Sequence, residues 1–140
     1  MVELNGVSYF SADDGVSGEE LWRSDGTPAG TWKLKDICSG LCSSSPRELT
    51  VVGQKLFFAA DDGVNGLELW KSDGTTAGTV LVKNIFFGVT PSDPQMLVGM
   101  NGVLYFRAND GSTGVELWKS NGTAGGTFRV KDIHAGSSSS

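Results

Sequence analysis

The sequence predicts an all-β protein built from three copies of one four-stranded antiparallel unit. Residues 18–32, 66–80 and 114–128 repeat the same pattern, in which Glu-Leu-Trp is followed by Ser-Asp/Asn-Gly-Thr. The copies lie 48 residues apart without insertion or deletion, which indicates a duplicated structural unit. Short apolar runs separated by glycine-containing turns favour strands over helices.

We expect one repeat domain whose units span residues 1–48, 49–96 and 97–140. A chain of 140 residues is long enough to bury a real core. No apolar run is long enough to cross a bilayer, and no signal peptide is recognisable at the start. The net charge of −5 and the scattered lysines do not favour a nucleic-acid partner.

Each unit opens with two apolar runs joined by a tight turn. Asn5-Gly6 and Asn101-Gly102 suit a type I′ hairpin because both residues tolerate a positive φ. The second run is apolar on consecutive residues, so we expect both of its faces to be covered. The expected first strands are 1–4, 49–52 and 97–100, and the second strands are 7–12, 56–60 and 104–108.

An acidic turn, a third strand, a hairpin and a fourth strand complete the unit. The fourth strand alternates, with Trp32 and Leu34 on one face and Lys33 and Lys35 on the other, as expected of a half-exposed edge. The first three strands are expected to be buried. The third strands are placed at 20–23, 68–71 and 116–119, and the fourth at 32–37, 80–85 and 128–133.

A gradient from buried to exposed strands is typical of a β-propeller blade. The polar connectors at 38–48 and 86–96 are long enough to return to the inner strand of the next blade. Three blades cannot close a ring, because propellers use about four to eight. We therefore expect a homodimer in which each chain supplies half of a six-bladed propeller. A β-trefoil, which also has three repeats of four strands, is the main alternative, and a β-sandwich is another.

The Glu-Leu-Trp-x-x-Asp-Gly-Thr motif resembles the ELWxxDGT repeat family of bacterial, often extracellular, multi-repeat proteins. The resemblance covers nearly the whole chain, with Asn121 and Asn109 as departures. It implies a propeller-like repeat and an extracellular or cell-surface setting, but no defined activity.

The hairpin at 24–27 is also similar to the Asp-box of sialidase-type propellers, where the carboxylate bonds amides of its own turn. This similarity implies a structural role for the hairpin residues. They are Asp25, Asp73, Asn121, Thr31, Thr79 and Thr127.

The acidic turns are candidates for calcium, because Asp-Asp-Gly-x-x-Gly-x-Glu offers hard oxygen ligands within eight residues. The alternative is an Asx-turn that caps a hairpin, and it is favoured because the order of an EF-hand is missing. The candidate ligands are Asp13, Asp14, Asp61 and Asp62. No other cofactor is expected.

The repeated tryptophans have two interpretations. They either form core between blades or stack on sugar rings, with polar neighbours bonding the hydroxyls. A ring with repeated weak sites would gain avidity on multivalent glycans. The candidate binding residues are Trp22, Trp70, Trp118, Glu20, Glu68 and Glu116.

No catalytic residue is assigned. The only histidine, His134, lies in the connector of the third unit, where a surface role is expected. Cys38 and Cys42 occur only in the first unit, either as two thiols or as a local disulfide. The favoured function is a non-enzymatic, lectin-like binding module. A structural or protein-binding scaffold without a small-molecule ligand, which includes an excised or engineered propeller fragment, is the second hypothesis, and a glycoside hydrolase is a distant third.

Overall fold

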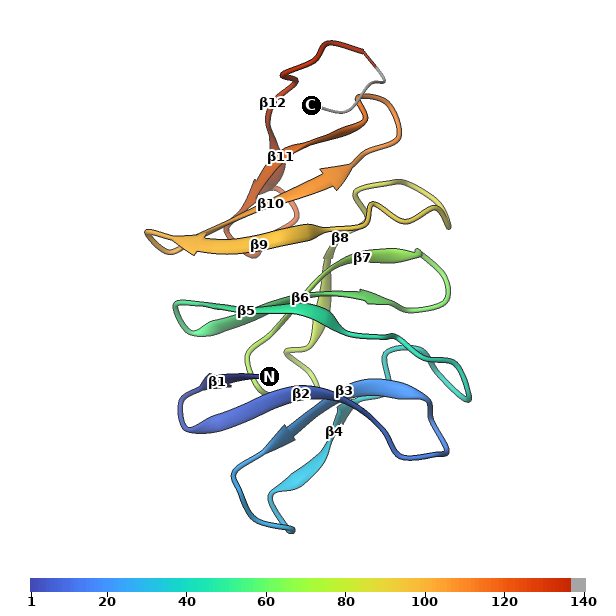
Figure 1. Ribbon diagram of the computed structural model, residues 1–140, viewed down its shortest axis with the longest axis vertical. Coiled ribbons are helices and arrows are strands. Elements are labelled where there is room, and N and C mark those ends of the chain that lie inside the picture. The colour runs from blue at the N-terminus through green and yellow to red at the C-terminus, as the bar shows by residue number, and fades with distance from the viewer. Residues whose placement is uncertain (137–140) are drawn as a thin grey trace.

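The computed structural model describes residues 1–136 and consists of three separate four-stranded antiparallel sheets (Figure 1). Each sheet contains only strands of one sequence repeat, in the order first to fourth, so each repeat is one blade. The predicted all-β, blade-like fold is confirmed. A trefoil, in which the repeats share one barrel, does not fit these separate sheets. Within the described residues, no helix is long and apolar enough to cross a membrane.

The strand bounds follow the 48-residue period. Blade 1 contains β1 (Val2–Leu4), β2 (Val7–Asp13), β3 (Glu19–Ser24) and β4 (Thr31–Lys35). Blade 2 contains β5 (Arg47–Val52), β6 (Lys55–Asp61), β7 (Leu67–Ser72) and β8 (Val80–Lys83). Blade 3 contains β9 (Gln95–Met100), β10 (Val103–Asn109), β11 (Val115–Ser120) and β12 (Thr127–Lys131).

The tight turn between the first two strands has the predicted backbone. Asn5 and Gly6 have φ values of 54° and 78°, and Asn101 and Gly102 have values of 53° and 76°. Both residues of each pair therefore occupy the left-handed region that a type I′ turn requires.

The fourth strand ends earlier than predicted. Residues 36 and 37 belong to the connector, because the backbone amides of Ile37 and Cys38 donate to the carboxylate of Glu20. A bulge between Leu21 and Trp22 also shifts the pairing of β3 with β4.

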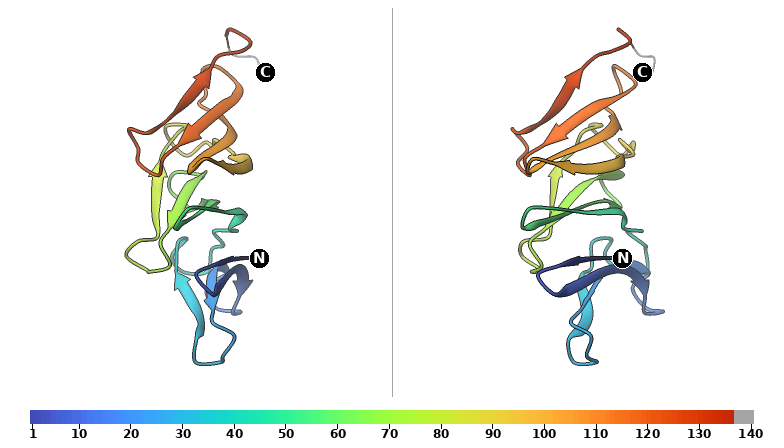
Figure 2. Two further views of the ribbon diagram at one scale, coloured as in Figure 1. Left: turned by 90° about the vertical axis from the view of Figure 1, so that its left-hand side faces the viewer. Right: turned by 60° about the vertical axis from the view of Figure 1, so that its left-hand side comes forward.

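The three blades are stacked face to face, with their first strands along one side and their fourth strands along the other (Figure 2). One apolar cluster fills the space between blades 1 and 2, and a second fills the space between blades 2 and 3. The second strand of the middle blade contributes to both clusters, because Phe57 faces blade 3 and Phe58 faces blade 1. Its continuous apolar run is thereby explained: both of its faces are covered, as predicted.

The first strands are more exposed than predicted. In β5 of the middle blade, which has a neighbour on both faces, Leu49, Thr50 and Val51 are only half-buried, and Val52 alone is buried. Met100 of β9 is 54% exposed because no blade covers it, whereas its counterparts Leu4 and Val52 pack against the next blade. The prediction that the first three strands are buried is therefore wrong for the first strand.

Candidate functional site

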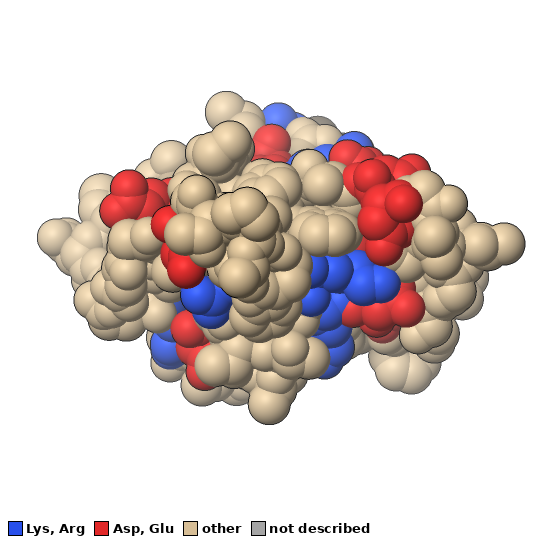
Figure 3. All heavy atoms as spheres, turned by 90° about the horizontal axis from the view of Figure 1, so that it is seen from below, with Lys and Arg blue, Asp and Glu red and all other residues tan. Residues whose placement is uncertain are grey.

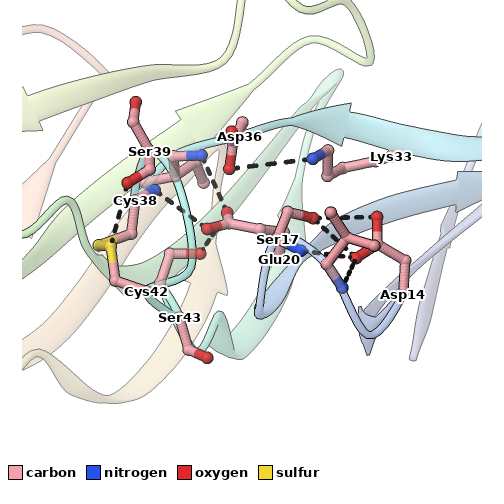
Figure 4. A network of polar contacts seen from close by, with 12 residues as sticks. Asp14, Ser17, Glu20, Lys33, Asp36, Cys38, Ser39, Cys42 and Ser43 are labelled. Atoms are coloured by element: carbon pink, nitrogen blue, oxygen red, sulfur yellow. Dashed lines mark hydrogen bonds and ion pairs between the residues drawn. A yellow bond between two sulfur atoms is a disulfide. The ribbon is translucent and has the colours of Figure 1, made fainter.

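The three repeated glutamates lie beneath the connectors as buried anchors. In blade 1 the carboxylate of Glu20 accepts hydrogen bonds from the amides of Ile37 and Cys38, at 2.9 and 3.0 Å, and from the Ser44 hydroxyl at 2.6 Å. Figure 4 shows Glu20 pointing toward the connector that carries Cys38 and Cys42. Each glutamate is almost fully buried: Glu20, Glu68 and Glu116. This placement disagrees with a ligand-binding role for the glutamates and gives them a structural one.

Blade 2 repeats the same anchor. Glu68 accepts from the amides of Ile85 and Phe86, at 2.9 and 3.1 Å, and from the Ser92 hydroxyl at 2.6 Å. Burial raises the pKa of Glu68, and these hydrogen bonds oppose the rise. A buried carboxyl with a raised pKa is the profile of a general acid. Here both oxygens are committed to the connector, so the geometry favours an anchor.

The repeated tryptophans lie at the interfaces between blades. Trp70 packs in the cluster between blades 1 and 2, and Trp118 packs in the cluster between blades 2 and 3. Trp22 is half-buried, because it faces away from the other blades. The indole nitrogens of all three are buried without an acceptor among the described residues. Trp70 and Trp118 therefore present neither a ring face nor an N–H to a sugar, and only Trp22 keeps an accessible surface.

The Ser-Asp-Gly-Thr hairpin is held together by its own side chains. In blade 2 the carboxylate of Asp73 accepts from the amide and hydroxyl of Thr75, at 2.9 and 2.6 Å. These bonds, the hydroxyl of Thr75 first, lower the pKa of Asp73. A Cβ at Gly78 would collide with the Asp73 carboxylate, which explains the second glycine of the motif.

The other two hairpins use the same bonds. Asp25 accepts from the amide and hydroxyl of Thr27 at 2.9 and 2.6 Å, and the amide oxygen of Asn121 accepts from those of Thr123 at 2.9 and 2.7 Å. Thr31, Thr79 and Thr127 each donate a hydroxyl to a carbonyl four residues earlier and pair with the serine of the preceding strand. The geometry thus fits the structural role assigned to these residues.

The acidic turns are Asx-turns. Asp13 accepts from the amide of Gly15, and Asp14 accepts from the amides of Val16 and Ser17. The Ser17 and Val16 amides lower the pKa of Asp14 to about 2. Asp61 and Asp62 make the corresponding bonds to Gly63, Val64 and Asn65. These bonds fit the capping interpretation of the aspartates. Across residues 1–136, no three acidic, histidine or cysteine side chains gather as metal ligands.

Cys38 and Cys42 form a disulfide within the first connector. Cys38 is buried and Cys42 is exposed, and the position opposite Cys38 is Gly63 in the acidic turn of blade 2. Phe86 takes the same position against Gly111 in blade 3. His134, the third equivalent, is exposed at the end of the stack.

A cleft of about 430 Å³ lies where the second connector passes the beginnings of the first strands of blades 2 and 3. Its wall combines apolar side chains with a guanidinium, an amide and carboxylates. The main lining residues are Arg47, Asp61, Leu67, Val89, Asp93 and Gln95. Sequence reasoning missed this cleft. The available signal was that its polar positions differ between copies: Gln95 corresponds to Arg47, Asn109 to Asp61 and Ser45 to Asp93.

Within the cleft, hydrogen bonds among the described residues use only some of the polar side chains. Asp93 accepts from the side-chain amide of Gln95 at 2.6 Å, and Asp61 caps Gly63. No hydrogen bond or ion pair joins the Arg47 side chain to another described residue. Arg47, Asp93 and Gln95 are exposed, so they can still bond a ligand.

Comparison with known proteins gives no relative: no family model, curated protein or solved structure matches the chain.

Proposed function

We propose that this chain is a non-enzymatic β-propeller-type binding module whose ligand site is the cleft between blades 2 and 3. The observation that carries the proposal is the lining of the cleft. An available guanidinium, a carboxylate and an amide surround an apolar wall at positions where the repeats differ. A small number of polar groups can fix the orientation of a ligand, and an apolar surface can contact the face of a sugar ring. This combination suits a polyhydroxylated ligand, so a glycan is the favoured class.

The placement of the repeated residues supports this location. The glutamates, hairpin aspartates and acidic turns bond their own blades, so the motif builds the scaffold. Residues that differ between copies are then left to distinguish one ligand from another. The lectin-like hypothesis is thus retained, with its site moved from the tryptophans to the cleft.

The test is binding to a printed array of animal, plant and bacterial glycans, followed by titration with a glycan that binds. Arg47→Ala and Asp93→Asn should each weaken binding about tenfold or more, because each removes a polar contact at the site. Lys33→Ala, on β4 and remote from the cleft, is the matched control. A clean negative array would reject glycan binding, and unchanged affinity in both cleft variants would reject this site.

The second candidate is a structural or protein-binding scaffold without a small ligand. It is favoured by the fact that Trp70, Trp118 and all three repeated glutamates are buried parts of the blades. A negative array together with a stable, cooperative fold would favour this function.

An extracellular or cell-surface location remains part of the proposal. Its support is the Cys38–Cys42 disulfide, since disulfides persist mainly in oxidising compartments. Mass spectrometry of protein from secreting cells should find both sulfurs oxidised.

A further inference from the structure

The two ends of the blade stack expose the two halves of an interface that the chain already forms twice. We call the outer surface of blade 3 the blade 3 face and define it by Tyr105, Leu117, Val130 and Ile133. We call the outer surface of blade 1 the blade 1 face and define it by Ser8, Phe10, Ala12 and Trp22. Seen from below, the end formed by blade 1 has uncharged surface in its middle and charged groups around it (Figure 3).

The residues equivalent to the blade 3 face are buried in the other blades. Ile133 is 62% exposed, whereas Ile37 and Ile85 are 6% and 7% exposed. Val130 is 45% exposed, whereas its counterparts Leu34 and Val82 are 1% and 5% exposed. Each counterpart packs against the next blade, so the blade 3 face lacks only such a blade.

The blade 1 face shows the complementary pattern. Its residues are half-buried, and their counterparts form the side of each internal interface that receives the preceding blade. In blade 2 these counterparts are Leu56, Phe58, Ala60 and Trp70, and in blade 3 they are Leu104, Phe106, Ala108 and Trp118. Three of the four positions keep the residue type, and the fourth has Ser8 in place of leucine.

Polar contacts repeat across the internal interfaces as well. The Nζ atom of Lys35 donates to the carbonyl of Thr79 at 2.8 Å, and Lys83 donates to Thr127 at 3.0 Å. Lys131 is the third member of this series and is exposed, and Thr31 is the exposed counterpart of the two acceptors. Lys131 at one end of the stack and the Thr31 carbonyl at the other are therefore the donor and the acceptor that the same inter-blade hydrogen bond would need.

We propose that the blade 3 face of one chain covers the blade 1 face of a second copy, and that two such junctions close a six-bladed ring. The junction is head to tail, so it either closes or continues into a filament. Six is the only multiple of three blades within the range of about four to eight that propellers use. At each junction, Lys131 donates to Thr31 of the second copy, and His134 lies against Gly15, as Cys38 lies against Gly63.

The experiment measures the mass of the whole chain in solution by light scattering over a dilution series. The expected mass is twice 14.7 kDa. Ile133→Asp should break the blade 3 face and Ala12→Asp the blade 1 face, each giving a folded species of single-chain mass. Val64→Asp, an equally exposed loop position of blade 2, should leave the mass unchanged.

Mixing the two disrupted variants tests which faces meet. Ile133→Asp keeps an intact blade 1 face and Ala12→Asp keeps an intact blade 3 face, so the mixture should regain weak pairing through one good junction. If like faces paired instead, only the variant on the pairing face would disrupt association and the other would not, which would overturn the proposal.

A variant that tightens association provides a test that misfolding cannot explain. Ser8→Leu restores the leucine of the other two blades and should tighten association about tenfold or more, whereas Ser39→Leu, an exposed connector position, should not. A wild-type mass of one chain at all concentrations would overturn the proposal and assign the end faces to other blades. An open filament would overturn closure of the ring.

Discussion

At the scale of single residues, the repeated acidic side chains accept hydrogen bonds that hold turns and connectors in place. Glu68 joins β7 to the second connector through three donors, two of which are backbone amides that β8 no longer pairs. Such amides would otherwise be buried without an acceptor, which is costly. The repeated glutamate therefore determines where the fourth strand ends.

Glu68→Ala should destabilise the fold by about 3 kcal/mol, because three donors lose their acceptor at once. Glu68→Gln should lose less stability than Glu68→Ala, because one oxygen remains as an acceptor while the amide nitrogen faces a donor. Urea unfolding at a fixed protein concentration measures the difference. Glu3→Ala, at an exposed position of β1, is the control and should change stability by less than about 0.5 kcal/mol. Equal stability of Glu68→Ala and wild type would show that water replaces the carboxylate.

The hairpin aspartate should tolerate asparagine but not alanine. Asn121 makes the same two bonds as Asp73, so Asp73→Asn should keep the thermal midpoint within about a degree or two. Asp73→Ala removes both bonds and should lower the midpoint by several degrees. Differential scanning calorimetry distinguishes these results, and equal effects of both substitutions would contradict a capping role.

Acid should weaken the acidic turn of blade 1 within a defined window. The pKa of Asp14 is lowered from 3.8 to about 2 in the folded chain by the amides of Ser17 and Val16. A lowered folded-state pKa contributes stability above the unfolded value, and this contribution is lost as the pH falls from about 4 to about 2. Asp14→Asn should flatten the profile of stability against pH in that window. An unchanged slope in Asp14→Asn would exclude these bonds as the cause.

At the scale of elements, the connectors show which features a sequence can predict. The Asn-Gly turns, the 48-residue period and the buried second strand follow from local patterns, because turn chemistry and strand periodicity act over a few residues. The cleft, the buried glutamates and the Lys35–Thr79 bond join residues 17 to 48 positions apart. Local patterns carry no information about such pairs, so they assign Glu20 to a binding site and Lys35 to a solvent-facing edge.

The first connector should keep its packing without the disulfide if the equivalent residues of blade 2 replace the two cysteines. Cys38→Ala with Cys42→Ala should cost about 2 kcal/mol, because the bond closes a short loop and Cys38 packs toward Gly63. Cys38→Phe with Cys42→Thr, the pair found in blade 2, should lose less, since Phe86 fills the same position without a disulfide. Urea unfolding without reductant compares the two double variants. Equal losses would show that packing against the next blade contributes little.

At the scale of the whole molecule, each blade is stabilised by the neighbouring blades that cover its two faces. Blade 2 is covered on both faces and has the most completely buried second strand, whereas blades 1 and 3 each leave one face open. Stability in such a stack depends on the number of covered faces as well as on the number of blades. The single chain therefore has two internal interfaces, and a ring of two chains would have six.

A tandem duplication tests this dependence in a single chain. Two copies of the sequence joined by four residues that preserve the 48-residue period should give a monomeric ring, since the junction becomes internal and its association cost disappears. Its midpoint of thermal unfolding should be independent of protein concentration, whereas that of the natural chain should rise with concentration. Calorimetry over a hundredfold range of concentration measures both. If the duplicated chain kept associating, or unfolded at the same temperature as the dilute single chain, six blades would not complete the ring.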